Sequence, residues 1–362
     1  MPTADELLGD AVAAELLDAL QAADRGNPFA ATRAAVARLR GQPLGDRARS
    51  LAAGLVADTG HDHARLARVV RAAYEDPALA GWHVWPVTHA LATTGVQDPD
   101  PRAFDDALDL MAHLTPRLTS EFALRLLLRH DTARVLERAR RWTGHEDEHV
   151  RRLASEGTRP RLPWGLGVPV LTADPQLTRP LLDALHDDAS EHVRRSVANH
   201  LNDHGRLHPG FAVEVAGGWL ASAHGPRTVR HALRGLVKKG HPGALELLGF
   251  GAVRVRTSPL EVTPRVVAIG GDVTFRATLE NLDARPAEVA VDHVLTFPGA
   301  RGGQRSKTFT LTRLRLAPGE VAEVRGTHSF RQLSTRTHVP GPASLALQVN
   351  GVRQPATGLT LV

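Results

Sequence analysis

Residues 148–152 read Glu-His-Val-Arg-Arg, and the same five residues recur at 191–195, 43 positions further along the chain. A shorter match, Thr-Val-Arg-His at 228–231, follows after a similar interval. Each copy carries apolar residues at three- and four-residue spacing, which places them in one stripe along a helix. The stripes consist of Val150, Leu153 and Ala154, of Val193, Val197 and Leu201, and of Val229, Leu233 and Leu236. Such stripes must be covered by neighbouring helices, so these segments predict stacked helical repeats.

The same helical periodicity extends over the chain before residue 252. Ala, Leu, Arg and Val recur at helical spacing, separated by short turns that carry Gly, Pro, Asp or His. The clearest segments are Asp5–Ala23, Ala31–Arg40, His63–Tyr74, Ser120–His130, Ala133–Trp142, Glu148–Glu156 and Glu191–Asp203. A period near 40 residues with two helices per unit is typical of HEAT-like repeats. We therefore expect residues 1–251 to form a right-handed α-solenoid.

The pattern changes beyond Phe250, where Val, Thr and Leu alternate with polar residues in short runs. Turn signals such as Gly270-Gly271 and Pro318-Gly319 separate the runs. The clearest runs are Val253–Arg256, Asp272–Leu279, Glu288–Phe297, Lys307–Leu316 and Ser344–Val349. About seven short strands in this stretch are typical of an immunoglobulin-like β-sandwich. We expect such a domain over residues 252–362.

The composition excludes several classes of protein. The chain of 362 residues contains no cysteine, which rules out disulfide scaffolds, thiolate metal sites, iron–sulfur clusters and cysteine nucleophiles. No apolar run approaches the roughly 20 residues that span a bilayer. The first ten residues are acidic and lack the basic and apolar regions of a signal peptide. We therefore expect a soluble, cytoplasmic protein with no membrane partner.

The net charge of +5 conceals an uneven distribution. Residues 1–116 carry a net charge of −6, residues 117–165 carry +4, and residues 253–362 carry +6. Nearly all the cations are arginines, whose planar guanidinium suits phosphate groups. This distribution weakly indicates an anionic partner.

Outside the apolar stripes, the helices of the central repeats carry arginines at four-residue spacing. Stacking the repeats would align these positions in a basic strip, formed by Arg125 and Arg129, Arg152 and Arg159, Arg195, and Arg230, Arg234, Lys238 and Lys239. Three carboxylates, Glu121, Glu156 and Asp203, interrupt the strip. A carboxylate in a groove that binds phosphates repels its ligand. The mixture therefore suggests that these acids act on a positively charged species.

Each carboxylate also has a purely structural interpretation. Glu121 follows Ser120 and could complement the helix dipole or pair with Arg125. Glu156 stands four residues after Arg152, which is an ordinary ion-pair spacing on a helix. Asp203 could simply close its helix. Taken singly, the three acids are more often structural than catalytic.

The segment after Glu156 is unusual for a connection between helices. Residues 156–165 read Glu-Gly-Thr-Arg-Pro-Arg-Leu-Pro-Trp-Gly, so two prolines and two glycines end the helix and make a rigid turn. Trp164 in this turn has two interpretations, a core anchor or a residue of a site. The other four tryptophans are expected in the core, at positions 82, 85, 142 and 219.

Here the chain resembles a known family. Residues 150–164 are similar to the signature of the AlkC branch of the DNA alkylation repair glycosylases, which are HEAT-like proteins related to the AlkD branch. The segments 120–123, 199–203 and 238–242 also resemble this branch, and some of its members carry a C-terminal immunoglobulin-like domain. The resemblance implies excision of 3-methyladenine and 3-methylcytosine from duplex DNA, without swinging the lesion into a deep pocket. It also implies a monofunctional enzyme that uses no cofactor and acts on bacterial nucleoid DNA; we expect a monomer.

Carried over to this chain, the resemblance implies that Glu121, Glu156 and Asp203 are catalytic and that Trp164 lines the site. An N3-methylated base is a cation and leaves easily, so a carboxylate need only stabilise the sugar oxocarbenium ion and activate water. Either Asp203 or Glu156 could activate the water. The residues expected to hold DNA phosphates are Arg152, Arg159, Arg161, Arg195, Lys238 and Lys239.

Other interpretations remain open at this stage. His200, His204 and His208 have a spacing that could suit a metal, but Gly205 interrupts their helix and we expect no metal site. The basic sandwich could contact DNA through Arg301, Arg305 or Lys307, or could simply be solvated. Two rival functions are a non-catalytic HEAT scaffold and a protein that recognises damaged duplex DNA without cutting it.

Overall fold

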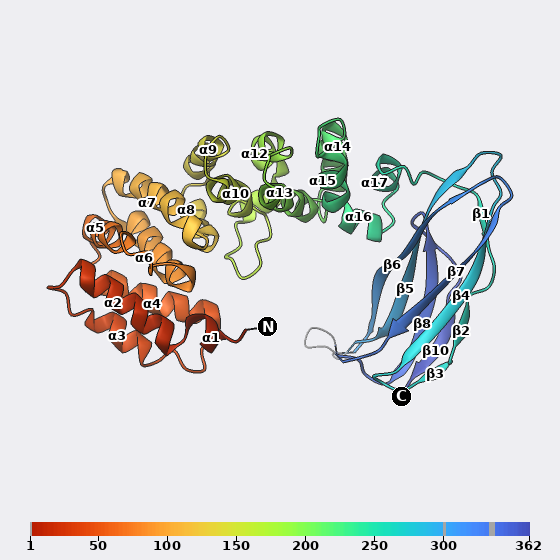
Figure 1. The fold of residues 1–362 in the computed structure, drawn as a ribbon, viewed down its shortest axis with the longest axis horizontal. Coiled ribbons are helices and arrows are strands. Elements are labelled where there is room, and N and C mark those ends of the chain that lie inside the picture. Colours follow the sequence, from red (N-terminus) through yellow and green to blue (C-terminus); the bar gives the residue numbers. More distant parts are fainter. Residues whose placement is uncertain (1, 300–301, 333–336) are drawn as a thin grey trace. The chain divides into compact units, whose positions relative to one another are not determined.

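The computed structural model describes residues 2–299, 302–332 and 337–362, so Arg301 lies outside the described residues. The chain forms a row of helices followed by two β-sheets, which confirms the predicted order of a helical array and a sandwich (Figure 1). Packing divides it into two compact units. One contains residues up to His208 together with Trp219–Ala232, and the other contains Pro209–Gly218 and Leu233–Val362.

The first unit is built from α-helices with three short 3₁₀ helices. Its elements are α1 (Ala4–Leu8), α2 (Asp10–Ala23), α3 (Ala30–Val36), α4 (Leu44–Asp58), α5 (His63–Tyr74), η1 (Gly81–His83), α6 (Val84–Gln97), α7 (Pro101–Leu114), η2 (Thr115–Arg117), α8 (Glu121–His130), α9 (Thr132–Trp142), α10 (Glu148–Glu156), α11 (Pro169–Ala173), η3 (Pro175–Thr178), α12 (Arg179–Leu185), α13 (Glu191–His204) and α15 (Gly225–Ala232). The second unit holds nearly all of α14 (Pro209–Trp219), and α16 (Arg234–Lys238) and α17 (Pro242–Leu247).

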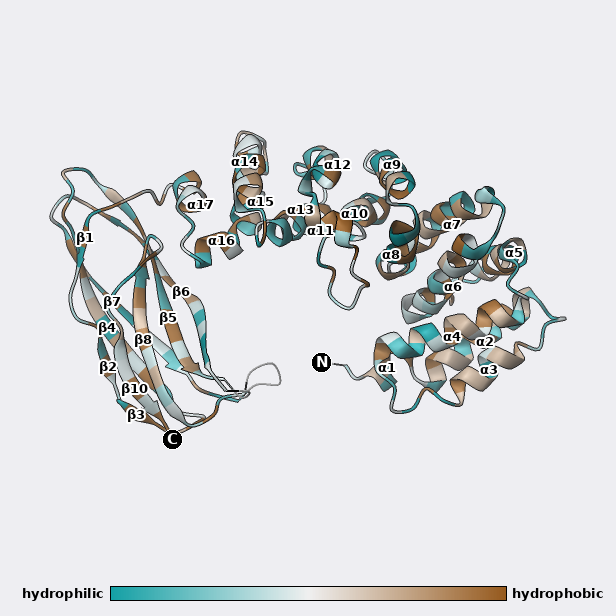
Figure 2. Ribbon diagram, turned by 180° about the vertical axis from the view of Figure 1, so that it is seen from behind, coloured by the Kyte–Doolittle hydropathy of each residue, from teal (hydrophilic) through white to brown (hydrophobic). Residues whose placement is uncertain are grey.

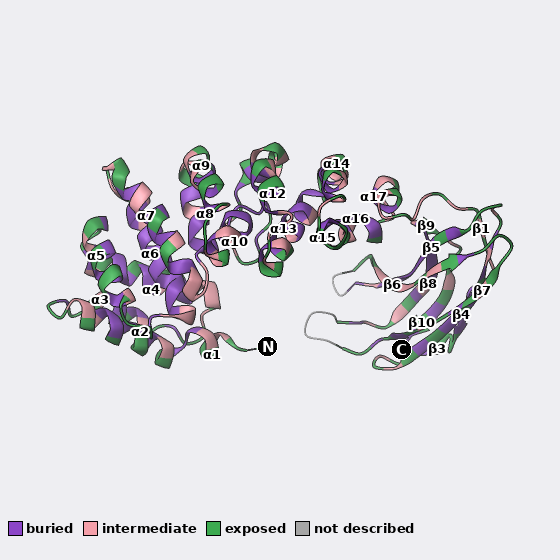
Figure 3. Ribbon diagram, turned by 45° about the horizontal axis from the view of Figure 1, so that its top comes forward, coloured by how far each residue is buried: buried purple, intermediate pink, exposed green. Residues whose placement is uncertain are grey.

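The predicted apolar stripes are the surfaces that pack. Helix α10 packs against α13, and α13 packs against α15, as expected for consecutive repeats. All nine stripe residues are buried. The helices of this unit carry apolar segments (Figure 2) and buried segments (Figure 3). Of the expected core tryptophans, Trp85, Trp142 and Trp219 are buried and Trp82 packs partly exposed against a buried cluster.

One helix prediction was wrong at the N-terminus. The segment expected as a single helix is broken at Gly9, which adopts an extended conformation between α1 and α2. A Cβ atom at Gly9 would lie 2.2 Å from the carbonyl oxygen of Asp5. Only glycine fits this close approach, so the chain can turn there and start a second helix.

The sandwich consists of two mainly antiparallel sheets. In one, β4 pairs with β1, β2 and β7; in the other, the order is β3-β10-β8-β5-β6, with β9 beside β8 and a parallel pair formed by β3 and β10. The strands are β1 (Val255–Thr257), β2 (Glu261–Thr263), β3 (Val266–Val267), β4 (Asp272–Asn281), β5 (Ala287–Pro298), β6 (Gln304–Leu316), β7 (Val321–Ser329), β8 (Gly341–Val349), β9 (Val352–Arg353) and β10 (Thr357–Leu361). Alternate residues of the facing sheets form a buried core that includes Phe275, Leu295 and Leu345.

The last helices pack with the strands of the second unit. A Cβ atom on Gly240 would lie 2.5 Å from the carbonyl oxygen of Gly351, and Gln348 donates a hydrogen bond to the carbonyl oxygen of Lys238 (3.3 Å). The change in composition used to place a boundary at 251–252 therefore marks where helices give way to strands, while α16 and α17 belong with the sandwich by packing. Among the described residues, none of the helices combines the length and apolarity needed to cross a membrane.

Candidate active site

The three predicted carboxylates and two of the predicted arginines form one connected chain of ion pairs. Arg152 of α10 reaches Glu121, the first residue of α8, with an Nη1–Oε2 distance of 2.9 Å, and approaches Glu156 at 3.7 Å. Arg159, just beyond α10, donates to Oε1 of Glu156 (2.6 Å) and to Oδ2 of Asp203 near the end of α13 (2.8 Å). Three carboxylates and two guanidinium groups thus alternate, and the carboxylates come from three helices. We call these five residues the charge chain.

The charge chain is largely removed from solvent. Glu121, Glu156 and Asp203 are 8%, 6% and 7% exposed, which is unusual for acids unless they are paired. Burial raises the pKa of Glu121 and of Asp203 above the ordinary values, although Arg152 and Arg159 act in the opposite direction. Two arginines against three carboxylates leave one net negative charge when all five are ionised.

The carboxylates differ in how many of their oxygens are engaged. Both oxygens of Glu156 accept bonds, Oε1 from Arg159 and Oε2 from the buried hydroxyl of Ser196 (2.6 Å). In each of Glu121 and Asp203, the side-chain hydrogen bonds and ion pairs go to a single oxygen within the described residues. Within the described residues, Oε1 of Glu121 and Oδ1 of Asp203 therefore remain available to a substrate or a water molecule.

The loop that joins α10 to α11, residues 157–168, projects from the row of helices (Figure 1). Leu162 anchors it in a buried cluster with Phe122 and Trp85. Trp164, by contrast, is 69% exposed and has a positive φ of 63°, a conformation that is costly for a bulky residue. The core-anchor interpretation of Trp164 was therefore wrong, because Leu162 is the anchor and Trp164 points to solvent.

The same architecture occurs in a solved structure of Pseudomonas fluorescens alkylpurine DNA glycosylase AlkC bound to DNA containing an abasic site analog. The two chains cover each other completely, with a TM-score of 0.90 and 31% identity. The chain belongs to the AlkC family. YhaZ of Bacillus subtilis (strain 168) is 36% identical over 250 residues, which cover 68% of this chain and 70% of YhaZ. Residues 256–362 match the family model described as the C-terminal Ig-like domain of YhaZ, in agreement with the predicted sandwich.

The predicted phosphate-binding residues of this AlkC-family chain fall into two groups. Arg161, Arg195, Lys238 and Lys239 are exposed, and the two lysines belong to the second compact unit. Arg195 lines a cavity of about 160 Å³ between α13 and α15. The other two, Arg152 and Arg159, have their guanidinium groups on carboxylates, and their contact with phosphates stays a prediction.

The prediction that Arg125 belongs to the exposed basic strip was wrong. This side chain is fully buried and does not pair with Glu121, whose partner is Arg152 from a neighbouring helix. The guanidinium of Arg125 instead donates to three backbone carbonyls of the 157–168 loop. An arginine at helical spacing from other arginines was expected to share their exposed face, and tertiary packing overrides that expectation.

Ser196 is a site residue that the sequence reasoning missed. The two copies of the repeat align Ser196 with Leu153, so a hydroxyl replaces an apolar side chain on a buried stripe. That exchange was the available signal, because a buried hydroxyl needs a hydrogen-bond partner. The partner is Glu156, and Ser196 also lies 3.1 Å from the hydroxyl of Ser155.

The three histidines considered for a metal have other partners. Nδ1 of His200 lies 3.0 Å from the carbonyl oxygen of Ser155, and Nε2 of His204 lies 2.9 Å from the hydroxyl of Thr178. Nε2 of His208 lies 2.9 Å from the carbonyl oxygen of Thr172. Within the described residues, no group of three or more suitable side chains could hold a metal ion.

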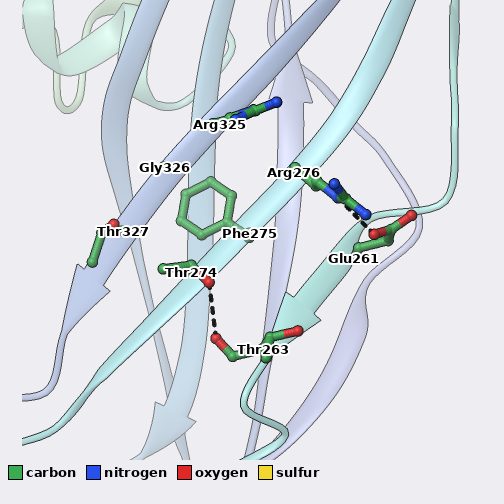
Figure 4. A pocket seen from close by; sticks show the side chains of 8 residues that line it. All are labelled: Glu261, Thr263, Thr274, Phe275, Arg276, Arg325, Gly326 and Thr327. Carbon is green, nitrogen blue, oxygen red and sulfur yellow. Dashed lines mark hydrogen bonds and ion pairs between the residues drawn. The ribbon is translucent and has the colours of Figure 1, made fainter.

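A larger cavity, of about 590 Å³, is lined by residues of β2, β4 and β7 (Figure 4). Its charged groups are already paired, since Arg276 donates to Glu261 (2.7 Å) and Arg325 pairs with Glu323. Threonines and Gly326 supply most of the remaining lining. This surface has no unpaired acid or base among the described residues, so the charge chain is the better candidate for chemistry.

Proposed function

We propose that the protein is a monofunctional DNA glycosylase that removes N3-alkylated bases, namely 3-methyladenine and 3-methylcytosine, from duplex DNA by hydrolysing the N-glycosidic bond. The observation that carries the proposal is the charge chain, in which three carboxylates from three helices lie together. The family to which the protein belongs includes a DNA glycosylase. A relative solved with abasic-site DNA supports duplex DNA as the partner. We expect the monomer to be the active species.

The chemistry suits carboxylates. When the C1′–N bond breaks, its electron pair passes to the cationic base, which leaves neutral and needs no strong general acid. The sugar becomes an oxocarbenium ion, which a nearby carboxylate stabilises electrostatically. Water then attacks C1′ and gives up a proton, leaving an abasic site with a hydroxyl group. These steps need no cofactor.

The three carboxylates differ in their hydrogen bonds, and we assign each a different role on this basis. Asp203 has an available Oδ1 and a pKa raised by burial, which makes it a stronger base, while Arg159 favours its ionised form. We assign water activation to Asp203 and stabilisation of the oxocarbenium ion to Glu121, which keeps Oε1 available. Glu156 has both oxygens engaged and is assigned to orient the two arginines.

Trp164 and the exposed cations complete the proposed site. An exposed indole can stack on the sugar or the cationic base and attract its positive charge. Arg161 and Arg195 hold phosphates, and Arg152 and Arg159 contribute to the same field. Lys238 and Lys239, in the second unit, are proposed to hold phosphates separately. Each carboxylate is carried at or near the end of a helix and keeps a small exposed fraction. This placement supports excision without flipping the base into a deep pocket.

The test incubates the protein with N-methylated duplex DNA and measures released bases by chromatography. Release of 3-methyladenine and 3-methylcytosine that falls at least 100-fold in Asp203→Asn and Glu121→Gln supports the proposal, since losing one preorganised charge costs on the order of 100-fold. Binding of damaged duplex without release favours the damage-recognition protein. If the protein neither binds damaged duplex nor releases a base, the result favours the non-catalytic HEAT scaffold.

A further inference from the structure

Arg125 holds both ends of the 157–168 loop. Its Nε donates to the carbonyl oxygen of Leu166 (2.7 Å), near the end of the loop. Its Nη1 donates to the carbonyl oxygens of Gly157 (3.2 Å) and Arg159 (2.5 Å), at the start. One guanidinium thus ties together two stretches of backbone that the loop separates by about seven residues.

The clamped backbone carries the groups assigned to the site. The carbonyl of Arg159 is fixed by Arg125, while the side chain of Arg159 bridges Glu156 and Asp203. Another of the three clamped carbonyls, that of Leu166, lies two residues after Trp164. A shift of the loop would therefore displace both the bridging guanidinium and the exposed indole.

The burial of Arg125 shows that this arrangement is specific. The residue is fully buried, and its Nη2 has no hydrogen-bond partner within the described residues. Burial lowers the pKa of its guanidinium to about 10, so the group remains charged at neutral pH. A charged group is retained in the interior at a free-energy cost, and its bonds go to backbone of this loop.

We infer that Arg125 is a positioning residue, which fixes the loop so that Arg159 stays between Glu156 and Asp203 and the exposed Trp164 keeps its place in the loop. The inference rests on the proposed glycosylase function for its effect on rate. Within the described residues, the hydrogen bonds of Arg125 go to backbone carbonyls and not to a carboxylate of the charge chain. Its action passes through the backbone of the loop.

The chain offers a matched control in Arg47. It is also buried (2% exposed) and donates to the backbone carbonyls of Ala4, Leu8 and Gln42, in the N-terminal part of the chain. Arg47→Gln removes a buried backbone clamp away from the loop, together with an ion pair to the exposed Asp5. Comparison with Arg47→Gln therefore separates the effect of losing any buried arginine from the effect of losing the contacts of Arg125 with the loop.

The experiment compares Arg125→Gln, Arg125→Lys and Arg47→Gln at a temperature where all three are folded. Excision by Arg125→Gln is expected to fall on the order of 100-fold in single turnover, as for a small misplacement of reacting groups. The loss of DNA affinity should be smaller, because Arg161 is the one exposed phosphate-binding residue assigned to this loop. The acidic limb of its pH–rate profile should move to higher pH, because a displaced Arg159 and the lost charge of Arg125 both cease to favour ionised Asp203. Arg125→Lys keeps the positive charge, so a limb that also moves in that variant reports the displacement of Arg159. Arg47→Gln should excise at the wild-type rate, and the acidic limb of its pH–rate profile should stay in place. Arg125→Lys should show the same direction of change in excision rate and acidic limb as Arg125→Gln, since a single ammonium nitrogen cannot hydrogen-bond to both ends of the loop.

A second readout is independent of activity. Trypsin cleavage at the Arg161–Leu162 bond, followed by fragment mass, should be faster in Arg125→Gln than in wild type and in Arg47→Gln. An unchanged cleavage rate with an unchanged pH limb overturns the inference, and so does full activity of Arg125→Lys. Wild-type protein that releases no base overturns the proposed function instead, while the cleavage comparison still tests the clamp.

Discussion

Arg159 contacts Asp203 through two of its nitrogens, with Nε–Oδ2 and Nη2–Oδ2 distances of 2.9 Å and 2.8 Å, although 44 residues separate them in the sequence. Both groups are buried. The bond leaves Oδ1 of Asp203 available and favours the ionised carboxylate that a general base must present.

The first prediction concerns pH. Burial raises the pKa of Asp203, and Arg159 lowers it, so replacing Arg159 by Gln should raise it further. A base must be deprotonated, and the acidic limb of the single-turnover rate should therefore move to higher pH in Arg159→Gln. Arg134→Gln, which breaks the ion pair with Asp105, should leave the limb in place. A limb that does not move in Arg159→Gln argues against Asp203 as the base.

The second prediction concerns Ser196. Ser196→Ala removes the donor to Oε2 of Glu156, and an unsatisfied buried acceptor costs about 1–3 kcal/mol of unfolding free energy. Excision should slow by about 10-fold because Glu156 no longer holds the arginines in one orientation. Ser190→Ala loses the N-cap of α13, which costs about 1 kcal/mol, and should excise at the wild-type rate. Equal rates for both variants would remove Ser196 from the site.

The third prediction separates activity from stability at Trp164. The side chain is 69% exposed and its φ is 63°, so Gly relieves backbone strain while making the unfolded chain more flexible. Trp164→Gly should therefore unfold within about 1 kcal/mol of wild type, by denaturant titration. Its excision rate should fall by at least about 10-fold, since the cation–π contact is lost. A fully active variant would show that the indole takes no part.

The fourth prediction concerns the exposed lysines of α16 and the residue after it. Lys238→Ala and Lys239→Ala should each weaken binding of undamaged duplex and reduce the slope of log affinity against log salt by about 1. Arg254→Ala, whose guanidinium pairs with Asp283, provides a cation control from the same compact unit and should leave the slope unchanged. Slopes identical to wild type in the first two variants would show that these lysines contact no phosphate.

Much of the fold could be predicted because its signals are local. The stripes around Val150 and Val193 follow from helical periodicity, and the bounds of α5 and α10 match the expected segments. Other features escaped. Gly9 breaks a helix through a close approach to Asp5 that depends on three-dimensional geometry, and β7, whose alternation is interrupted at Gly326 and His328, was not among the expected strands.

The candidate site could be predicted in its residue types but not in its connections. Glu121, Glu156 and Asp203 were chosen because acids interrupt a basic strip, and a family resemblance supplied Trp164. The pairing of Glu121 with Arg152 rather than Arg125 depends on distances between helices, which sequence spacing does not encode. A fully buried arginine such as Arg125 is also too rare to expect from sequence.

The most direct test of the central claim is the single-turnover release of 3-methyladenine from duplex DNA by wild type and by Asp203→Asn. The substitution keeps the size of the side chain but removes the proposed base. We predict release by the wild-type protein and a rate at least about 100-fold lower for the variant, with DNA binding retained. Absence of release by wild type, or equal rates for the two proteins, would contradict the account.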